Sequence, residues 1–462
     1  MLNLIALEYD LKTTYDEKSI NSIMEQILYF QSSLEINDLD IWTLDYVKIK
    51  DKWKIISSLL FEPEYIKKLA PKYIKSQKGT KEYKEEYEEL MKEIKKLKNI
   101  QANILNKKIN KNLIDGFITF LLTDSQKEKM INEYGLDFSI WKTYSNFRIN
   151  LSFQDLDNWE LGAYFSIRKI NKTPFTLEEM NVTKTIKDKF SEWSWLILIS
   201  WPTGSAKTST LISIMDWINK TKYKKIITIE DPIEFYWSWL QNKCTFRQRE
   251  IGKSCLSFPH WLKQAVRQDP DIIIVWEIRD AETASLAIEA ANTWHLVIAT
   301  IHVNSTTEVL NRLLGFFDWT KSKEIATKLA WVLKFILNQR LITTVKKEYK
   351  VAYEWLDPTI WWLKTLIKEA NLDDMRSKMY EIDENWKSYN KTLNESLFER
   401  IVNWELTSTS AKEHYSNEVN IFDKEFKIFK TRYIKHNWLS EKEVEKKIFI
   451  AEEIEKLNNK TK

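Results

Sequence analysis

A polar loop that ends in lysine and threonine follows a short apolar run at "LILISWPTGSAKTST", residues 196–210. This pattern is typical of a P-loop, in which backbone N–H groups and a helix N-terminus cradle phosphates. In that chemistry, Lys207 would neutralise the β- and γ-phosphates, and the hydroxyl of Thr208 would bind Mg²⁺. The predicted nucleotide-binding residues are Trp201, Pro202, Thr203, Gly204, Ser205, Ala206, Lys207, Thr208 and Ser209.

Two positions of this loop depart from the P-loop pattern, because Trp201 and Ala206 stand where glycine is expected. The chain has 21 tryptophans and 7 glycines in 462 residues, whereas average usage would give roughly 32 glycines. Four tryptophans directly follow asparagine, in place of the Asn-Gly pair of tight turns: Trp159, Trp386, Trp404 and Trp438. We therefore hypothesise that most tryptophans are glycines in the living protein, made where UGA is read as glycine. The alternative is a tryptophan-rich protein with a degenerate loop, and the hypothesis does not explain Ala206, where positive φ would be strained.

Acidic residues and histidines adjoin the other apolar runs. Glu277 follows "DIIIVW", Glu230 ends "KIITIE", and His295 and His302 stand at the two ends of "LVIATI". In open α/β sheets, ligands bind at the C-terminal ends of the strands. A strand-terminal glutamate alone is often only solvated, and a lone histidine is often a satisfied polar residue. Four such elements in one order, beginning with a P-loop, argue against coincidence.

The elements that must position these residues follow a β-loop-α pattern from residue 193 onward. Apolar runs of strand length alternate with helical segments, which predicts a parallel sheet in an α/β domain. Before it, "DYVKIKDKWKIISSLLF" alternates like a β-hairpin, and "NFRINLSF" and "YFSIRKI" have strand character. Residues 63–112 are rich in Lys, Glu and Tyr and predict a solvated helical insertion, with a partner-binding helix as the alternative. After residue 320 we expect mostly helix.

Composition excludes several classes of protein. The net charge is +4, from 70 basic and 66 acidic residues, so there is no large basic field and no nucleic acid is expected as a partner. Two cysteines cannot build a disulfide framework or a four-cysteine zinc site. The longest apolar runs are far shorter than a bilayer span, and the N-terminus turns acidic within ten residues, unlike a signal peptide. We expect a soluble cytoplasmic protein.

Four segments together resemble the secretion ATPase superfamily of type II secretion and type IV pili. They are "TIEDPIEF", "RQREIGKSCLSF", "RQDPDIIIVWEIRD" and "TWHLVIATIHVNS". They are similar to the family's aspartate box, linking segment, Walker B signature and histidine box, and the signature has Trp276 in place of glycine. The resemblance covers roughly residues 36–418. Within the superfamily the pilus-retraction, twitching-motility (PilT-like) ATPases fit best, because extension and secretion ATPases commonly carry the zinc module that this chain cannot build.

The resemblance implies a role for each site residue. Lys207 and Thr208 match the Walker A pair. Glu277 matches the glutamate that lies near Mg²⁺ and the attacking water, and Glu230 matches the aspartate-box glutamate, which is a candidate general base. The two histidines match phosphate-sensing residues, and two arginines match those that the N-terminal domain offers to a nucleotide; the alternative for each arginine is an exposed strand residue. The catalytic residues implied are Glu277, Glu230, Arg148, Arg168, His295 and His302, and the metal-binding residues are Thr208 and Glu277.

The resemblance also implies an architecture and an activity. We expect a mixed α/β, PAS-like N-terminal domain at 1–180, a RecA-like P-loop ATPase core at 181–345, and C-terminal helices and a tail at 346–462. The chain would use ATP and Mg²⁺, assemble as a homo-hexamer, and work against an inner-membrane platform protein at the cytoplasmic face of the membrane. Retraction, extension and secretion remain open. The rivals are an inactive scaffold, in which the tryptophans are real and the loop is blocked, and a P-loop motor for DNA transfer.

Overall fold

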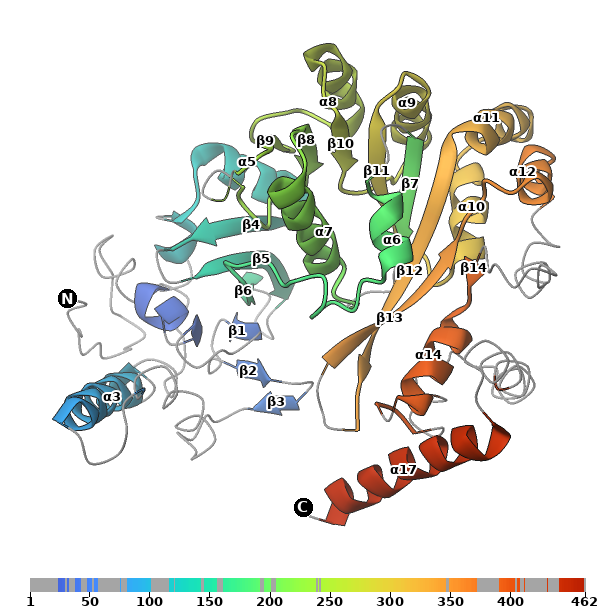
Figure 1. The fold of residues 1–462 in the computed structure, drawn as a ribbon. Helices are drawn as coiled ribbons and strands as arrows, with labels where there is room; N and C mark the ends of the chain where they lie inside the picture. The colour runs from blue at the N-terminus through green and yellow to red at the C-terminus, as the bar shows by residue number, and fades with distance from the viewer. Residues whose placement is uncertain are drawn as a thin grey trace. The chain divides into compact units, whose positions relative to one another are not determined.

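A computed structural model gives the fold (Figure 1). The residues described are 24–29, 31–32, 38–42, 48–51, 54–56, 75, 81–100, 116–119, 121–142, 145–155, 161–191, 195–200, 205–237, 240, 242–345, 349–371, 390–403, 405–407, 411, 430 and 440–460. They belong to two compact units: residues 1–173 with 232–235, and residues 174–231 with 236–462. None of the described helices combines the length and the apolar character needed to cross a membrane.

The first unit is built on an antiparallel sheet of six strands in the order β3-β2-β1-β6-β5-β4. The strands are β1 (Asp38–Trp42), β2 (Lys48–Asp51), β3 (Lys54–Ile56), β4 (Gly135–Trp141), β5 (Asn146–Asp155) and β6 (Leu161–Ile170). Along β5 the side chains of Phe147, Ile149 and Leu151 are fully buried, whereas Arg148 between them is only half-buried. This alternation has the period of a strand with one face in the core. The predicted hairpin is confirmed, because β2 pairs with β3 antiparallel.

Among the described residues of this unit, two helices have ten or more residues, α3 (Lys81–Ile100) and α5 (Asp124–Glu133). Helix α3 lies within the charged segment 63–112, where the sequence predicts a helical insertion. The rest of that segment, apart from residue 75, lies outside the described residues. Helix α5 begins with a capping box, in which the Thr123 hydroxyl accepts from the Gln126 backbone while the Gln126 side chain accepts from Thr123. Such reciprocal bonds satisfy two N–H groups that a helix start leaves free.

The second unit contains an eight-stranded sheet in the order β14-β13-β12-β7-β11-β10-β8-β9. Its strands are β7 (Trp195–Ser200), β8 (Lys225–Glu230), β9 (Thr245–Glu250), β10 (Ile272–Val275), β11 (Leu296–Ile301), β12 (Leu333–Thr343), β13 (Tyr349–Leu356) and β14 (Asn390–Lys391). From β12 to β9 every neighbouring pair is parallel, and β13 and β14 join antiparallel. The predicted parallel sheet of an α/β domain is confirmed.

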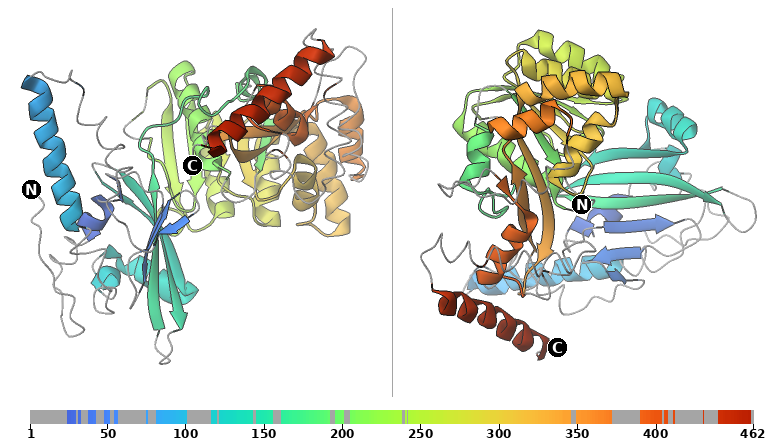
Figure 2. Two further views of the ribbon diagram at one scale, coloured as in Figure 1. Left: turned by 90° about the horizontal axis from the view of Figure 1, so that it is seen from below. Right: turned by 90° about the vertical axis from the view of Figure 1, so that its right-hand side faces the viewer.

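Helices connect and cover these strands, as two further views show (Figure 2). They are α6 (Lys184–Lys189), α7 (Lys207–Thr221), α8 (Phe258–Ala265), α9 (Ala281–Asn292), α10 (Thr306–Leu314), α11 (Trp319–Val332), α12 (Trp361–Lys368) and α14 (Leu393–Val402). A further helix, α17 (Glu441–Lys460), packs against α14. Every residue of β10 and β11 is buried, which is why these strands read as continuous apolar runs. Side chains cap several helix starts, for example Asp280 at α9 and Ser305 at α10.

The expectation of mostly helix after residue 320 is wrong for residues 333–343 and 349–356, which form β12 and β13. Helix α11 ends at Val332, and β12 begins at the next residue without a turn. The segment mixes apolar residues with Lys334 and with the polar residues 338–340, so its sequence shows no clear period of either structure. Pairing with β7 on one side and β13 on the other makes it a strand.

Backbone angles support the glycine hypothesis at two tryptophans. Trp195 has φ 114° and Trp294 has φ 69°, values that side-chain-bearing residues rarely adopt. Trp294 is also 84% exposed, so it gains little from packing. By contrast Trp237 and Trp355 are buried, and Trp237 stacks on Phe246 with ring centroids 4.5 Å apart. The backbone angles therefore support the glycine hypothesis at Trp195 and Trp294 and do not bear on the buried tryptophans.

The mass of the protein from its native organism tests this hypothesis. If most tryptophans are glycines in the cell, the intact mass should lie far below the 55.4 kDa of the printed chain. Peptide sequencing would then place glycine at positions 195, 201 and 294. A native peptide that contains Trp201 would disprove the hypothesis for the loop. The chain with glycine at the mistranslated positions is called the glycine chain below.

Candidate functional site

The parallel sheet brings four strand ends to one edge. Strands β7, β11, β10 and β8 are successive neighbours, with Ser200 opposite Ile301 and Val275 opposite both Ala299 and Ile229. Because parallel strands end on the same side, the residues that follow them meet there. The described residues at this edge include Ser205 and Ala206 of the predicted P-loop, Glu230 at the end of β8, Glu277 after β10 and His302 after β11.

Helix α7 starts at this edge, directly after the predicted P-loop. Positions 201 to 204 lie outside the described residues, as does the side chain of Lys207. Ser205 is buried, and Ala206 is the N-cap of the helix with φ 60° and ψ 31°. Ala206 has no polar side-chain atom and makes no cap hydrogen bond to this helix start. The partly buried Thr208 lies beside the first N–H groups of α7, and such groups at a helix N-terminus can bind an anion such as a phosphate.

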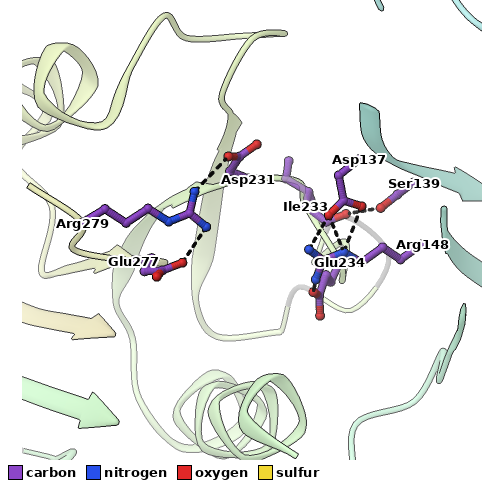
Figure 3. Close-up of polar contacts among 8 residues, drawn as sticks. All are labelled: Asp137, Ser139, Arg148, Asp231, Ile233, Glu234, Glu277 and Arg279. Atoms are coloured by element: carbon purple, nitrogen blue, oxygen red, sulfur yellow. Dashed lines mark hydrogen bonds and ion pairs between the residues drawn. The ribbon is translucent and has the colours of Figure 1, made fainter. Parts of the chain in front are cut away.

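Glu277 lies between two basic side chains. Arg279 Nη2 is 2.6 Å from Glu277 Oε2, and His302 Nε2 is 3.8 Å from Glu277 Oε1. The same guanidinium reaches Asp231 at the end of β8, with 3.8 Å between Nη1 and Oδ2 (Figure 3). These contacts orient the Glu277 carboxylate and tie together the ends of two strands. Sequence reasoning missed Arg279, although its place in "WEIRD", two residues after Glu277, was a usable signal.

The carboxylate of Glu230 is almost fully buried, with 1% of the residue exposed. Its Oε1 accepts hydrogen bonds from Thr228 Oγ1 at 2.6 Å and from Gln248 Nε2 at 3.0 Å. Gln248 comes from the neighbouring strand β9. A buried carboxylate held by fixed donors has a defined direction, which a general base requires.

The donors at this edge suit a Mg²⁺ ion that arrives with a nucleotide. Among the described residues, no group of three or more His, Cys, Asp or Glu side chains is placed to hold a metal by itself. Mg²⁺ is commonly bound through one or two carboxylates, with substrate phosphates and water completing the octahedron. The hydroxyl of Thr208 and the carboxylate of Glu277 are oxygen donors of the kind that this coordination would use.

His295 is not brought to this edge, although the sequence prediction grouped it with His302. The two histidines flank the six-residue strand β11, so roughly 20 Å of extended chain separates them. His295 Nδ1 lies 3.1 Å from the carbonyl of Ala290 and 3.1 Å from Thr293 Oγ1, at the end of α9. This position does not fit a phosphate contact within its own chain. The reason is geometric, because the start and the end of a strand lie at opposite edges of a sheet.

The two predicted arginines belong to the first unit. Arg148 on β5 pairs directly with Arg168 on β6, so both side chains lie on one face of the sheet, where Arg168 is exposed. Arg148 Nε is 3.1 Å from each carboxylate oxygen of Asp137, its Nη2 is 2.5 Å from Oδ2, and its Nη1 donates to Glu234 (Figure 3). Burial acts to lower the pKa of Arg148, but the hydrogen bonds and charges of the two acids outweigh it and raise the pKa above its ordinary value.

The segment that holds Glu234 is the continuation of β8. Residues 232–235 follow Asp231 and belong to the first unit, although the chain on either side belongs to the second. Ser139 Oγ donates to the carbonyl of Ile233 at 3.0 Å, beside the ion pair of Arg148 with Glu234. Arg148 therefore fastens this segment to the antiparallel sheet, a role that sequence reasoning missed.

Comparison with known proteins agrees with the geometry. Residues 149–423 match the family model described as "Type II/IV secretion system protein". The chain is 34% identical over 265 residues to the "Type IV pilus retractation ATPase PilT" of Pseudomonas aeruginosa, covering 57% of this chain and 75% of the relative. It is 31% identical over 268 residues to a "Twitching motility protein" of Neisseria gonorrhoeae, covering 57% and 69%.

Solved structures share the fold. The crystal structure of the pilus retraction motor PilT with bound ADP superposes with a TM-score of 0.63 at 24% identity, over 86% of this chain and 97% of that one. The ATPase DotB of Legionella pneumophila gives a TM-score of 0.66 at 18% identity, over 88% and 98%. With the family model covering more than half of its length, this chain belongs to the type II/IV secretion system protein family.

Proposed function

We propose that this chain is an ATPase motor subunit that hydrolyses ATP with Mg²⁺ to drive retraction or assembly of a type IV pilus or a related secretion machine. The observation that carries the proposal is the meeting of Glu230, Glu277 and His302 at the sheet edge where α7 begins. Retraction is favoured within this range, because the relatives include a pilus-retraction ATPase and a twitching-motility protein.

Each part of the edge has a task in ATP hydrolysis. The N–H groups at the start of α7 and the ammonium of Lys207 bind the phosphates. Thr208 holds Mg²⁺, which when bound neutralises charge on the phosphate oxygens. Glu277, oriented by Arg279 and His302, polarises the attacking water, with Glu230 as the second candidate base.

Assembly and partners follow from the relatives rather than from the described residues. We propose a homo-hexamer in which Arg148 and Arg168 stabilise the γ-phosphate charge as arginine fingers. For Arg148 this requires exchange of its carboxylate partners for a nucleotide. The hexamer would act on an inner-membrane platform protein, as a cytoplasmic motor at the inner face of the membrane.

Phosphate release by purified protein tests the activity. The glycine chain should hydrolyse ATP in the presence of Mg²⁺ and run as a hexamer in a mass measurement in solution. Lys207→Ala should weaken nucleotide binding, because it removes a cation from the phosphates. Lys220→Ala is the matched control, since Lys220 is an exposed lysine at the other end of α7 paired with Asp216. A glycine chain that assembles without hydrolysing ATP would instead be the inactive scaffold.

A further inference from the structure

Strand β12 carries three successive polar residues near its middle, Asn338, Gln339 and Arg340. The side chains of Asn338 and Gln339 are fully buried. A buried amide costs free energy unless it is hydrogen-bonded, so these residues need partners in the fold. The amide nitrogens of both residues donate to acceptors near the C-terminal ends of the parallel strands, whereas Asn338 Oδ1 and Gln339 Oε1 accept no hydrogen bond from the described residues.

Gln339 reaches into the predicted P-loop. Its Nε2 donates to the carbonyl oxygen of Ser205 at 2.5 Å. The reach is possible because β12 lies beside β7, with Asn338 opposite Ser200, the last residue before the loop. Gln339 therefore stands one residue beyond that pair, level with the turn into α7.

This hydrogen bond sets the direction of the peptide between Ser205 and Ala206. In a planar trans peptide the C=O and N–H groups point in opposite directions, so the N–H of Ala206 points away from Gln339. Ala206 itself is left-handed, with φ 60° and ψ 31°. That conformation costs roughly 1–2 kcal/mol in a residue with a Cβ. Alanine at position 206 therefore needs a stabilising contact from another part of the chain to hold this conformation. Glycine at the same position would not need one.

Asn338 acts on a second loop from the opposite face of β12. Its Nδ2 donates to Ser200 Oγ at 2.9 Å and to the carbonyl of Val303 at 3.3 Å, one residue after His302. Its cross-strand neighbour Glu354 accepts from both the backbone N–H and the hydroxyl of Thr306, each at 2.6 Å. The middle of β12, with β13, thus contacts both Ser205 at the end of the predicted P-loop and the loop that carries His302.

We propose that Gln339 is a positioning residue for nucleotide binding, which keeps the Ser205–Ala206 peptide in the conformation that the phosphates require. The inference rests on the proposed function, because it assumes that nucleotide binds at this loop. Gln339 touches no substrate and acts only through the backbone of Ser205. It compensates for the departure of this chain from the P-loop pattern at Ala206.

A double-mutant cycle in the full-length glycine chain tests the proposal through ADP affinity. Gln339→Met keeps the size of the side chain and removes the donor, so it should raise the Kd for ADP about fivefold, the worth of one ordinary hydrogen bond. Turnover at saturating ATP should change less than twofold, so that the effect is on KM. In an Ala206→Gly background the strain is relieved, and the same substitution should raise the Kd by less than twofold.

Asn219→Leu is the matched control at the other end of α7. Asn219 is also a buried amide bound to backbone, with Nδ2 donating to the carbonyl of Leu240 at 2.6 Å. Its loss should lower the melting temperature and leave ADP affinity unchanged. Gln339→Asn provides a second variant that keeps a polar amide but is too short to reach Ser205, and it should lose affinity like Gln339→Met.

Three results would overturn the proposal. Unchanged ADP affinity in both Gln339 variants, with only the melting temperature lowered, would make Gln339 a purely structural residue. If the Gln339 substitutions lowered ADP affinity equally with alanine and with glycine at position 206, the hydrogen bond from Gln339 to Ser205 would not act through Ala206. A parent glycine chain that binds no ADP would refute the proposed function itself, and the inference would fall with it.

Discussion

Glu277→Gln in the glycine chain should bind ATP as the parent does and hydrolyse it at least about 100-fold more slowly, the usual lower bound for the loss of a catalytic acid or base. Glutamine has nearly the shape of glutamate, and its carbonyl oxygen can still accept from Arg279, which in the parent lies 2.6 Å from Glu277. What disappears is the negative charge that would polarise the attacking water. Binding depends on the P-loop and α7 and should therefore survive.

The measurement pairs a titration with a fluorescent ATP analogue and an assay of phosphate release under single-turnover conditions. Glu282→Gln is the matched control, because Glu282 is an exposed glutamate on α9 that pairs with Lys263 at 2.8 Å. It should leave both binding and hydrolysis unchanged. Undiminished hydrolysis in Glu277→Gln would refute the proposal that Glu277 polarises the attacking water. Glu230 would then be the remaining candidate base.

The chain as printed, with all 21 tryptophans, should fold poorly or bind ATP at least about tenfold more weakly than the glycine chain, a loss of at least roughly 1.4 kcal/mol. A P-loop closes to hydrogen-bonding distance around the phosphates, and its first glycine turns without a side chain. Trp276 adds an indole next to Glu277 and is only 8% exposed. The backbone N–H of Trp276 donates to the carbonyl of Ile229, and the Thr300 hydroxyl donates to the carbonyl of Trp276. Because both backbone groups are hydrogen-bonded, the chain cannot easily move to make room for the indole.

A nucleotide titration on the two recombinant proteins, in the same buffer with Mg²⁺, measures the difference. Single substitutions locate it: Trp201→Gly in the printed chain should recover part of the affinity. Trp294→Gly should not, because Trp294 is exposed and precedes β11, at the edge away from the P-loop. Equal affinities of the printed chain and the glycine chain would mean that the loop tolerates tryptophan, and our account of Trp201 would be wrong.

The sequence was sufficient to predict the parallel sheet and three of the side chains that meet at the C-terminal ends of its strands, although it did not separate His295 from them. Buried parallel strands are apolar throughout, so β7, β8, β10 and β11 could be recognised one by one. Their C-terminal ends share an edge in any such sheet, whatever the order of the strands. That rule predicted Glu277 at the edge beside the predicted P-loop, and the resemblance to the family added Glu230 and His302.

Only the tertiary structure decided the contacts that depend on strand order and on chain reversal. Gln339 and Ser205 are 134 residues apart and meet because β12 lies beside β7. Arg148 and Glu234 are 86 residues apart and meet because residues 232–235 join the first unit. A local pattern shows that a segment is apolar or charged, but it carries no information about which distant segment will lie next to it.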